Sequence, residues 1–119
     1  LSKILKKESI SYFGLSDNIR DYIYIDDVVE SILQAIKYNG DGTIFNIGTG
    51  IGTKLSEVVE ILEQEIGEKA NISYEASRGV DVSYNVLCSG IAMKELQWKA
   101  NTGLTDGIRK MIQFCRKED

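Results

Sequence analysis

The sequence predicts an α/β fold with a few short strands and about four helices. Several short segments alternate apolar and polar residues or are rich in β-branched and aromatic residues, which is typical of strands. Longer segments between them repeat apolar residues every three or four positions, which is the spacing of an amphipathic helix. Glycine-rich turns separate the two kinds of segment, and the 119 residues fit one domain.

The first part of the chain is expected to form two strands and a helix. Leu1–Lys7 is typical of the end of a helix, Ile10–Phe13 of a strand, and Ile19–Ile25 of a second extended segment. Asp27 is expected to be the N-cap of the next helix, with Glu30 completing a capping box. The apolar stripe of that helix comprises Val28 or Val29, Ile32, Leu33 and Ile36.

The second part begins with a predicted strand at Thr43–Ile47. The clearest helix follows at Leu55–Ile66, with Thr53 as its expected cap and Gly67 as its end. Asn71–Glu75 alternates like a strand. Two further helices are expected to begin at Ser89 and Thr105.

Composition excludes several classes of site. The chain has no His, so it has no Ser-His or Cys-His pair and no His-containing metal site. Its two cysteines cannot form a Cys₄ zinc site, and their wide separation is typical of a cytoplasmic protein. A net charge of −4 argues against nucleic-acid binding. No apolar run approaches the ~20 residues of a membrane span.

Two local motifs resemble binding motifs, but a purely structural role explains each of them better. Gly48-Thr49-Gly50-Ile51-Gly52 lies between a predicted strand and a helix, but Thr53 stands where a dinucleotide loop needs a third glycine. A tight turn with positive φ is the favoured interpretation, and a pyrophosphate loop is the alternative. Asp26-Asp27 could suggest a metal-binding or phospho-acceptor pair, but helix capping explains at least one of the two carboxylates better.

Arg20 and Arg78 are the more informative side chains, because neither lies on the outer stripe of a predicted helix. Their guanidinium groups could bind a diphosphate through bidentate hydrogen bonds. The alternative is that each forms a structural ion pair, with Asp21 and Asp81 nearby. The residues alone leave these two interpretations open.

Five stretches, in the same order along the chain, resemble the extended short-chain dehydrogenases/reductases, the NAD-dependent sugar-nucleotide epimerase/dehydratase family. The first carries Arg20-Asp21-Tyr22 and ends at Val29, and the second is Phe45-Asn46-Ile47-Gly48-Thr49-Gly50. The other three are Arg78–Val82, Lys94–Trp98 and Leu104–Ile108. The resemblance covers nearly the whole chain.

The resemblance implies that residues 1–119 are the C-terminal substrate-binding portion of such a Rossmann-type enzyme. The NAD-binding part and the catalytic Tyr-x-x-x-Lys would then lie in an N-terminal part that this sequence does not contain. None of the six Tyr is followed four positions later by Lys. We therefore expect no catalytic residue here, and no cofactor or metal bound by this portion alone.

The resemblance also implies a nucleotide-diphosphate sugar as ligand. Arg20 and Arg78 are expected at its diphosphate, Asp81 at its ribose or in the loop that holds the ribose, and Tyr12 near its base. Two alternatives are a non-catalytic nucleotide-sugar-binding module and the C-terminal part of a sugar-nucleotide reductase.

The predicted strand at 44–47 would lie at the edge of the sheet of the longer enzyme. Without a neighbouring strand its edge is exposed, so we expect the chain to be marginally stable or to form a homo-oligomer.

Overall fold

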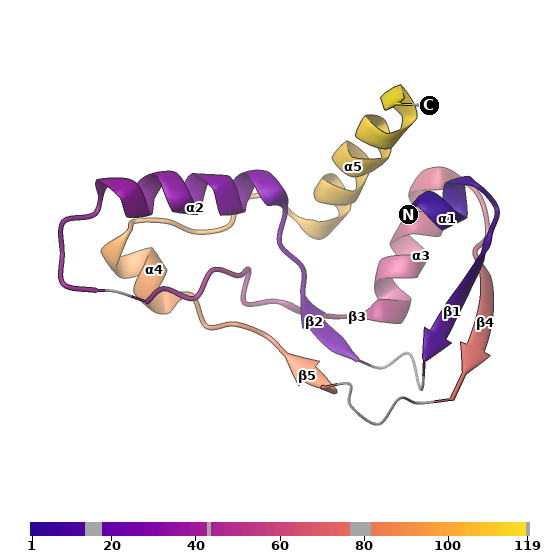
Figure 1. The fold of residues 1–119 in the computed structure, drawn as a ribbon, viewed down its shortest axis with the longest axis horizontal. Coiled ribbons are helices and arrows are strands. Elements are labelled where there is room, and N and C mark those ends of the chain that lie inside the picture. Colours follow the sequence, from indigo (N-terminus) through magenta and orange to yellow (C-terminus); the bar gives the residue numbers. More distant parts are fainter. Residues whose placement is uncertain (14–17, 43, 77–81, 119) are drawn as a thin grey trace.

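The computed structural model describes residues 1–13, 18–42, 44–76 and 82–118. It confirms the α/β class, with short strands between helices (Figure 1). The elements are, in order, α1 (Ser2–Leu5), β1 (Ser9–Phe13), β2 (Ile19–Asp21), α2 (Ile25–Lys37), β3 (Gly52–Lys54), α3 (Leu55–Ile66), β4 (Asn71–Glu75), β5 (Tyr84–Asn85), α4 (Gly90–Glu95) and α5 (Leu104–Glu118).

The described strands form two small sheets. In the first, β1 runs parallel to β4, from the pair Ser9–Asn71 to the pair Phe13–Glu75. In the second, β2 is the central strand, antiparallel to β3 and parallel to β5. Consequently β2 connects segments that lie far apart in the sequence.

Two hydrophobic clusters lie at the two ends of the molecule. One joins α1, α3 and α5 through Ile4, Leu62, Ile108 and Ile112, which are all buried. The other surrounds Trp98 with Ala92 and Leu96 at its centre. Figure 1 shows α4 at one end and the α1–α3 region at the other, with β2 and β3 between them.

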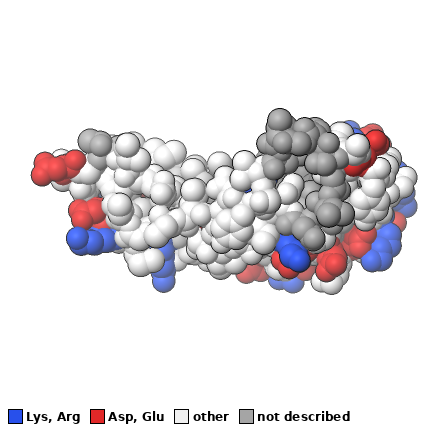
Figure 2. Space-filling model, turned by 90° about the horizontal axis from the view of Figure 1, so that it is seen from below, with Lys and Arg blue, Asp and Glu red and all other residues white. Residues whose placement is uncertain are grey.

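The molecule is flat and exposes much of its surface. Its extents are 49 × 37 × 18 Å and its radius of gyration is 16.7 Å, whereas a compact chain of this length has about 13.5 Å. Its accessible surface of 8227 Å² compares with about 6,500 Å² for a compact protein of this mass. Viewed from below, charged side chains lie mainly toward the two ends, and the surface between them is largely uncharged (Figure 2).

Asp27 does not cap α2, so that prediction was wrong. The helix begins at Ile25 after the extended residue Tyr24, and Asp27 lies in its first turn, 4% exposed. The Asp27 carboxylate accepts a hydrogen bond from the Thr102 amide at 2.9 Å, and its carbonyl accepts one from the Trp98 indole at 3.0 Å. Contact with this distant loop, which local spacing cannot reveal, decides the position of Asp27.

Three other boundaries differ from the predictions. Lys54 is the N-cap of α3, where the Glu57 carboxylate accepts from its amide at 3.3 Å, and Thr53 belongs to β3. The last helix begins at Leu104 instead of at Thr105. The extended segment from Ile19 forms a strand only as far as Asp21, because its partner strands end there. Gly67 ends α3 with φ of 80°, as predicted.

The predicted strand at Thr43–Ile47 is not present over the described residues 44–47, because no other described segment pairs with them. The alternation of burial is kept, however. Phe45 and Ile47 pack against the Trp98 cluster, while Ile44 is 80% exposed. The side chains of residues 44–47 therefore alternate between exposed and packed as they do in a strand, but no described strand pairs with this segment.

Most of the predicted apolar stripe of α2 also faces solvent, since Val29, Ile32, Leu33 and Ile36 are all about half exposed or more.

Over the described part of the chain, no helix has the length and apolarity that a membrane crossing requires. Those same residues contain no group of three His, Cys, Asp or Glu side chains placed to hold a metal ion.

Replacing Leu with Ala should affect stability differently at a buried position of the α1–α3–α5 cluster and at an exposed position of α2. Leu62→Ala removes a buried side chain from the α1–α3–α5 cluster and should lower the free energy of unfolding by about 2–4 kcal/mol. Leu33→Ala, on the exposed stripe, should change it by less than about 0.5 kcal/mol. Urea unfolding followed by circular dichroism measures both, and equal losses would contradict this assignment of the core.

Candidate functional site

A cleft between β1, β2 and the start of α3 contains two of the four predicted site residues, Arg20 and Tyr12. Its volume is about 280 Å³. We call it the Arg20 cleft, and it is lined by Ser11, Tyr12, Phe13, Asn18, Arg20, Tyr22 and Leu55. The other two predicted residues, Arg78 and Asp81, lie outside the described residues and stay predictions.

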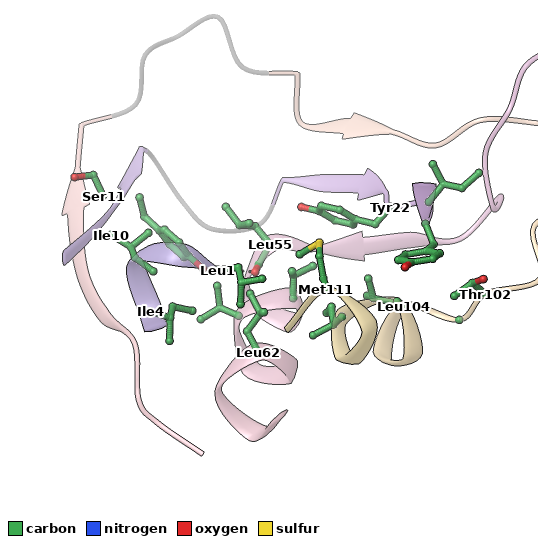
Figure 3. Close-up of a pocket in the computed structure, with 18 residues that line it drawn as sticks. Leu1, Ile4, Ile10, Ser11, Tyr22, Leu55, Leu62, Thr102, Leu104 and Met111 are labelled. Carbon is green, nitrogen blue, oxygen red and sulfur yellow. Dashed lines mark hydrogen bonds between the residues drawn. The ribbon is translucent and has the colours of Figure 1, made fainter. Parts of the chain in front are cut away.

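An apolar cavity of about 410 Å³ adjoins this cleft. The two share Ser11, Tyr12, Tyr22 and Leu55 in their walls. Figure 3 shows the cavity extending from Leu1 and Ile4 past Leu55 toward Leu104 and Thr102. The site therefore has a charged and hydroxylic part next to a larger apolar part.

Arg20 is half-buried on β2, where it stands opposite Thr53 of β3 and Asn85 of β5. Its guanidinium Nη1 donates to the Ile19 carbonyl at 2.9 Å. Because successive strand residues point to opposite faces, Arg20 and its neighbour Asp21 lie on different sides of β2. The ion pair between them that the sequence left open is not formed, and no other carboxylate of a described residue forms an ion pair with Arg20.

Tyr12 is 4% exposed, and its hydroxyl donates to the Leu55 carbonyl at 3.5 Å. Its ring meets that of Tyr74 edge to face, with centroids 5.9 Å apart. Burial is the main cause that raises the pKa of Tyr12, with smaller contributions from Tyr74, Tyr22 and Glu63. Burial also raises the pKa of Tyr22, although the charge of Arg20 opposes it. Both phenols are therefore neutral at physiological pH and can donate hydrogen bonds.

Asp21 holds three segments of the chain together. Its Oδ1 accepts from the Thr49 amide at 2.9 Å and from the Thr49 hydroxyl. Its Oδ2 accepts from the amides of Gly50 at 2.9 Å and Leu87 at 3.3 Å. Burial raises the pKa of Asp21, but these hydrogen bonds together outweigh burial, and the pKa lies below its ordinary value. The ionised carboxylate is the form that the fold stabilises.

The glycine cluster is a tight turn around this carboxylate, as the favoured interpretation predicted. Gly50 has a φ of +74°, which favours glycine. A Cβ at Gly48 would lie 2.6 Å from Oδ2 of Asp21. The amides of Thr49 and Gly50 already donate to Asp21, so they do not face an open space where a pyrophosphate would bind.

Ser11, Asn18 and Tyr22 were not among the predicted site residues. The signal for Tyr22 is its spacing, since it follows Arg20 by two positions and side chains two apart share one face of an extended segment. Ser11 and Asn18 belong to different segments that meet only in the folded chain, and no local pattern marks them.

Comparison with known proteins identifies relatives of the chain. Residues 1–48 match the family described as NAD dependent epimerase/dehydratase family. The dTDP-4-dehydro-6-deoxyglucose reductase of Escherichia coli is 34% identical over 116 residues, which are 98% of this chain and 37% of that protein. This chain is a relative of the NAD-dependent epimerases and dehydratases.

Solved structures of relatives have the same fold. The UDP-glucose 4-epimerase of Thermotoga maritima with UDP-glucose is 33% identical, with a TM-score of 0.91 over 98% of this chain and 37% of the other. MoeE5 in complex with UDP-glucuronic acid and NAD is 26% identical, with a TM-score of 0.93 over 98% of this chain and 40% of the other. The chain thus spans less than half the length of these relatives.

The Asp21 hydrogen bonds predict a pH-dependent stability. Because the folded-state pKa lies below the ordinary value of 3.8, ionised Asp21 stabilises the fold above that value, and its contribution is lost as the pH falls through the folded-state pKa. At pH 7, Asp21→Asn should lower the free energy of unfolding by about 1–3 kcal/mol. Urea unfolding between pH 2 and 7 should show the difference from wild type shrinking below about pH 4. A difference that stays constant would contradict this role.

The close packing around Gly48 predicts that adding one methyl group there lowers the stability of the fold. In Gly48→Ala the new Cβ would lie 2.6 Å from Asp21 Oδ2 and 2.9 Å from Leu87 Cβ, so the turn must shift, at a cost of about 1–3 kcal/mol. Gly103→Ala is the matched control, because nothing lies within 4 Å of its added Cβ. Thermal melts of the two variants should differ, and equal midpoints would show that Asp21 does not hold Gly48 closely.

Proposed function

We propose that this chain is the nucleotide-sugar-binding part of an NAD-dependent sugar-nucleotide epimerase or dehydratase. The observation that supports this most is the Arg20 cleft, where a guanidinium stands among hydroxyl, amide and aromatic side chains. Relatives whose folds match this chain were solved with UDP-sugars. A guanidinium suits the phosphates of a nucleoside diphosphate, hydroxyl and amide groups suit its ribose, and aromatic rings suit its base.

Arg20 would neutralise the diphosphate, because a guanidinium stays charged and can donate two parallel hydrogen bonds. The rings of Tyr12 and Tyr22 and the amide of Asn18 would contact the nucleoside. Arg78 is proposed as the second diphosphate contact and Asp81 as a residue near the ribose. Binding energy from the nucleotide would hold the sugar in place for chemistry carried out by other residues.

NAD, when bound, supplies a hydride acceptor for a sugar carbon. The amides of Thr49 and Gly50 in the glycine-rich turn donate to Asp21, which argues against that turn as the site of its pyrophosphate. We therefore propose that NAD binds to the part of the family's length that this chain does not span. Cys88 and Cys115 are free thiols, which supports a cytoplasmic location.

A sugar-nucleotide reductase is the second candidate, favoured by the 34% identity to the reductase of Escherichia coli. A nucleotide-sugar-binding module without catalysis is the third. The sequence preceding this portion in a longer protein distinguishes the last from the others, because a Tyr-x-x-x-Lys there would exclude a module without catalysis.

The proposed function predicts that UDP binding depends on Arg20. Titration of the chain with UDP by calorimetry should give a Kd that rises about 10- to 150-fold in Arg20→Ala, which corresponds to about 1.5–3 kcal/mol for one charge-assisted contact. Arg109→Ala is the control, because it removes the same charge from α5, where Arg109 pairs with Glu65. Equal affinity in the Arg20 variant, or no binding by the unmodified chain, would overturn the proposal.

A further inference from the structure

A further pocket lies between β3 and the loop that precedes α5. Its volume is about 220 Å³, and we call it the threonine pocket, because Thr49, Thr53 and Thr102 line it. Tyr22 lines both this pocket and the Arg20 cleft, so the two are neighbours. In Figure 3, Tyr22 lies beside β2 and Thr102 lies on the loop that leads into α5.

Part of the hydrogen-bonding capacity of the threonine pocket is not used within the chain. The Thr49 hydroxyl is used, since it donates to Asp21 and accepts from a backbone amide of its own turn at 3.1 Å. The hydroxyls of Thr53 and Thr102 and the side-chain amide of Asn101 form no hydrogen bond with another residue that the structure describes. These three groups are therefore available to donate to a ligand and to accept from it.

The backbone holds the two half-buried threonines Thr53 and Thr102 in place. Thr53 lies on β3 directly opposite Arg20 of β2, so these two side chains are on the same face of the sheet. The Thr102 amide donates to the buried Asp27 carboxylate at 2.9 Å, which fixes the loop that carries Thr102. A pocket whose polar groups are already in place loses less conformational freedom when a ligand binds.

The chemistry of the walls limits the kind of ligand. None of the described residues that line the pocket is charged, so it offers no cation to an anion and no carboxylate to a metal ion. Hydroxyl and amide groups beside the aromatic ring of Tyr22 suit a neutral molecule that carries several hydroxyls and an apolar ring face. Pockets for drug-sized ligands have about 300–1,000 Å³. The smaller volume of the threonine pocket suits a single sugar ring.

We propose that the threonine pocket is a binding site for a neutral hexose in its ring form, distinct from the Arg20 cleft. The hydroxyls of Thr53 and Thr102 and the Asn101 amide exchange hydrogen bonds with the ring hydroxyls. The Tyr22 ring packs against a face of ring C–H groups. The sugar is either free or attached to a nucleoside diphosphate, and only the second source rests on the proposed function.

Nuclear magnetic resonance of the isotopically labelled chain tests this site in separate titrations with D-glucose, UDP and UDP-glucose. A sugar in the pocket should shift the signals of Thr53, Asn101 and Thr102 until they saturate, whereas UDP alone should leave these signals unchanged. A free sugar as the natural source gives the shifts with both D-glucose and UDP-glucose. A nucleotide-borne sugar gives them with UDP-glucose only.

Replacing single threonines tests the hydrogen bonds. Thr102→Val removes one hydroxyl and should raise the Kd of the sugar ligand about 3- to 10-fold, because one neutral hydrogen bond is lost. Thr53→Val should have the same effect from the opposite wall. Thr105→Val is the matched control and should leave the Kd unchanged, since Thr105 lies in the first turn of α5 and does not line the pocket. Urea unfolding shows that each variant is folded before it is titrated.

The proposal is overturned if neither D-glucose nor UDP-glucose shifts the signals of the pocket, or if the shifts are spread over the surface and do not saturate. Unchanged affinity in both Thr53→Val and Thr102→Val would also overturn it. UDP alone tests the proposed function separately, through the residues of the Arg20 cleft. Binding of UDP without any response to a sugar contradicts the threonine pocket alone, and a response to D-glucose without binding of UDP contradicts the proposed function alone.

Discussion

The structure depends on one half-buried carboxylate, that of Asp21, which accepts four hydrogen bonds. Asp21 accepts hydrogen bonds from two amides and a hydroxyl of the turn at 49–50 and from the amide of Leu87, which precedes α4. Without Asp21 these donors would lose their acceptor in a partly buried place, which costs more than the bonds themselves contribute. The close approach of Gly48 to the same carboxylate shows how tightly this part of the chain is fitted around it.

The same constraint positions the candidate site. Arg20 and Asp21 are adjacent on β2, so anchoring Asp21 on one face of the strand fixes the direction in which Arg20 projects from the other. The strands β3 and β5 hold β2 on both sides and leave it little freedom to rotate. A guanidinium held in this way loses less conformational freedom when a diphosphate binds than one at the end of a mobile loop.

The sequence allowed the helices, the strands β1, β2 and β4 and the turn at Gly50 to be predicted, because their signals are local, whereas the short strands β3 and β5 were not predicted. The role of Asp27 was missed, because its partners Trp98 and Thr102 lie more than 70 residues away in the chain. The predicted strand at 43–47 was not formed, because strand pairing needs a second segment and none of the described residues supplies it. Of the residues that line the Arg20 cleft, Arg20 was singled out by its place outside the predicted helix stripes and Tyr12 through the family resemblance, whereas Ser11 and Asn18 are brought there only by folding.

The central claim is that a nucleoside diphosphate binds in the Arg20 cleft instead of at the glycine turn. Nuclear magnetic resonance of the isotopically labelled chain during a titration with UDP tests this most directly. The largest shifts are expected for Tyr12, Asn18, Tyr22 and the guanidinium of Arg20, with little change at residues 48–52. Shifts concentrated at residues 48–52, with Arg20 unaffected, would contradict the account and assign the phosphate to the turn.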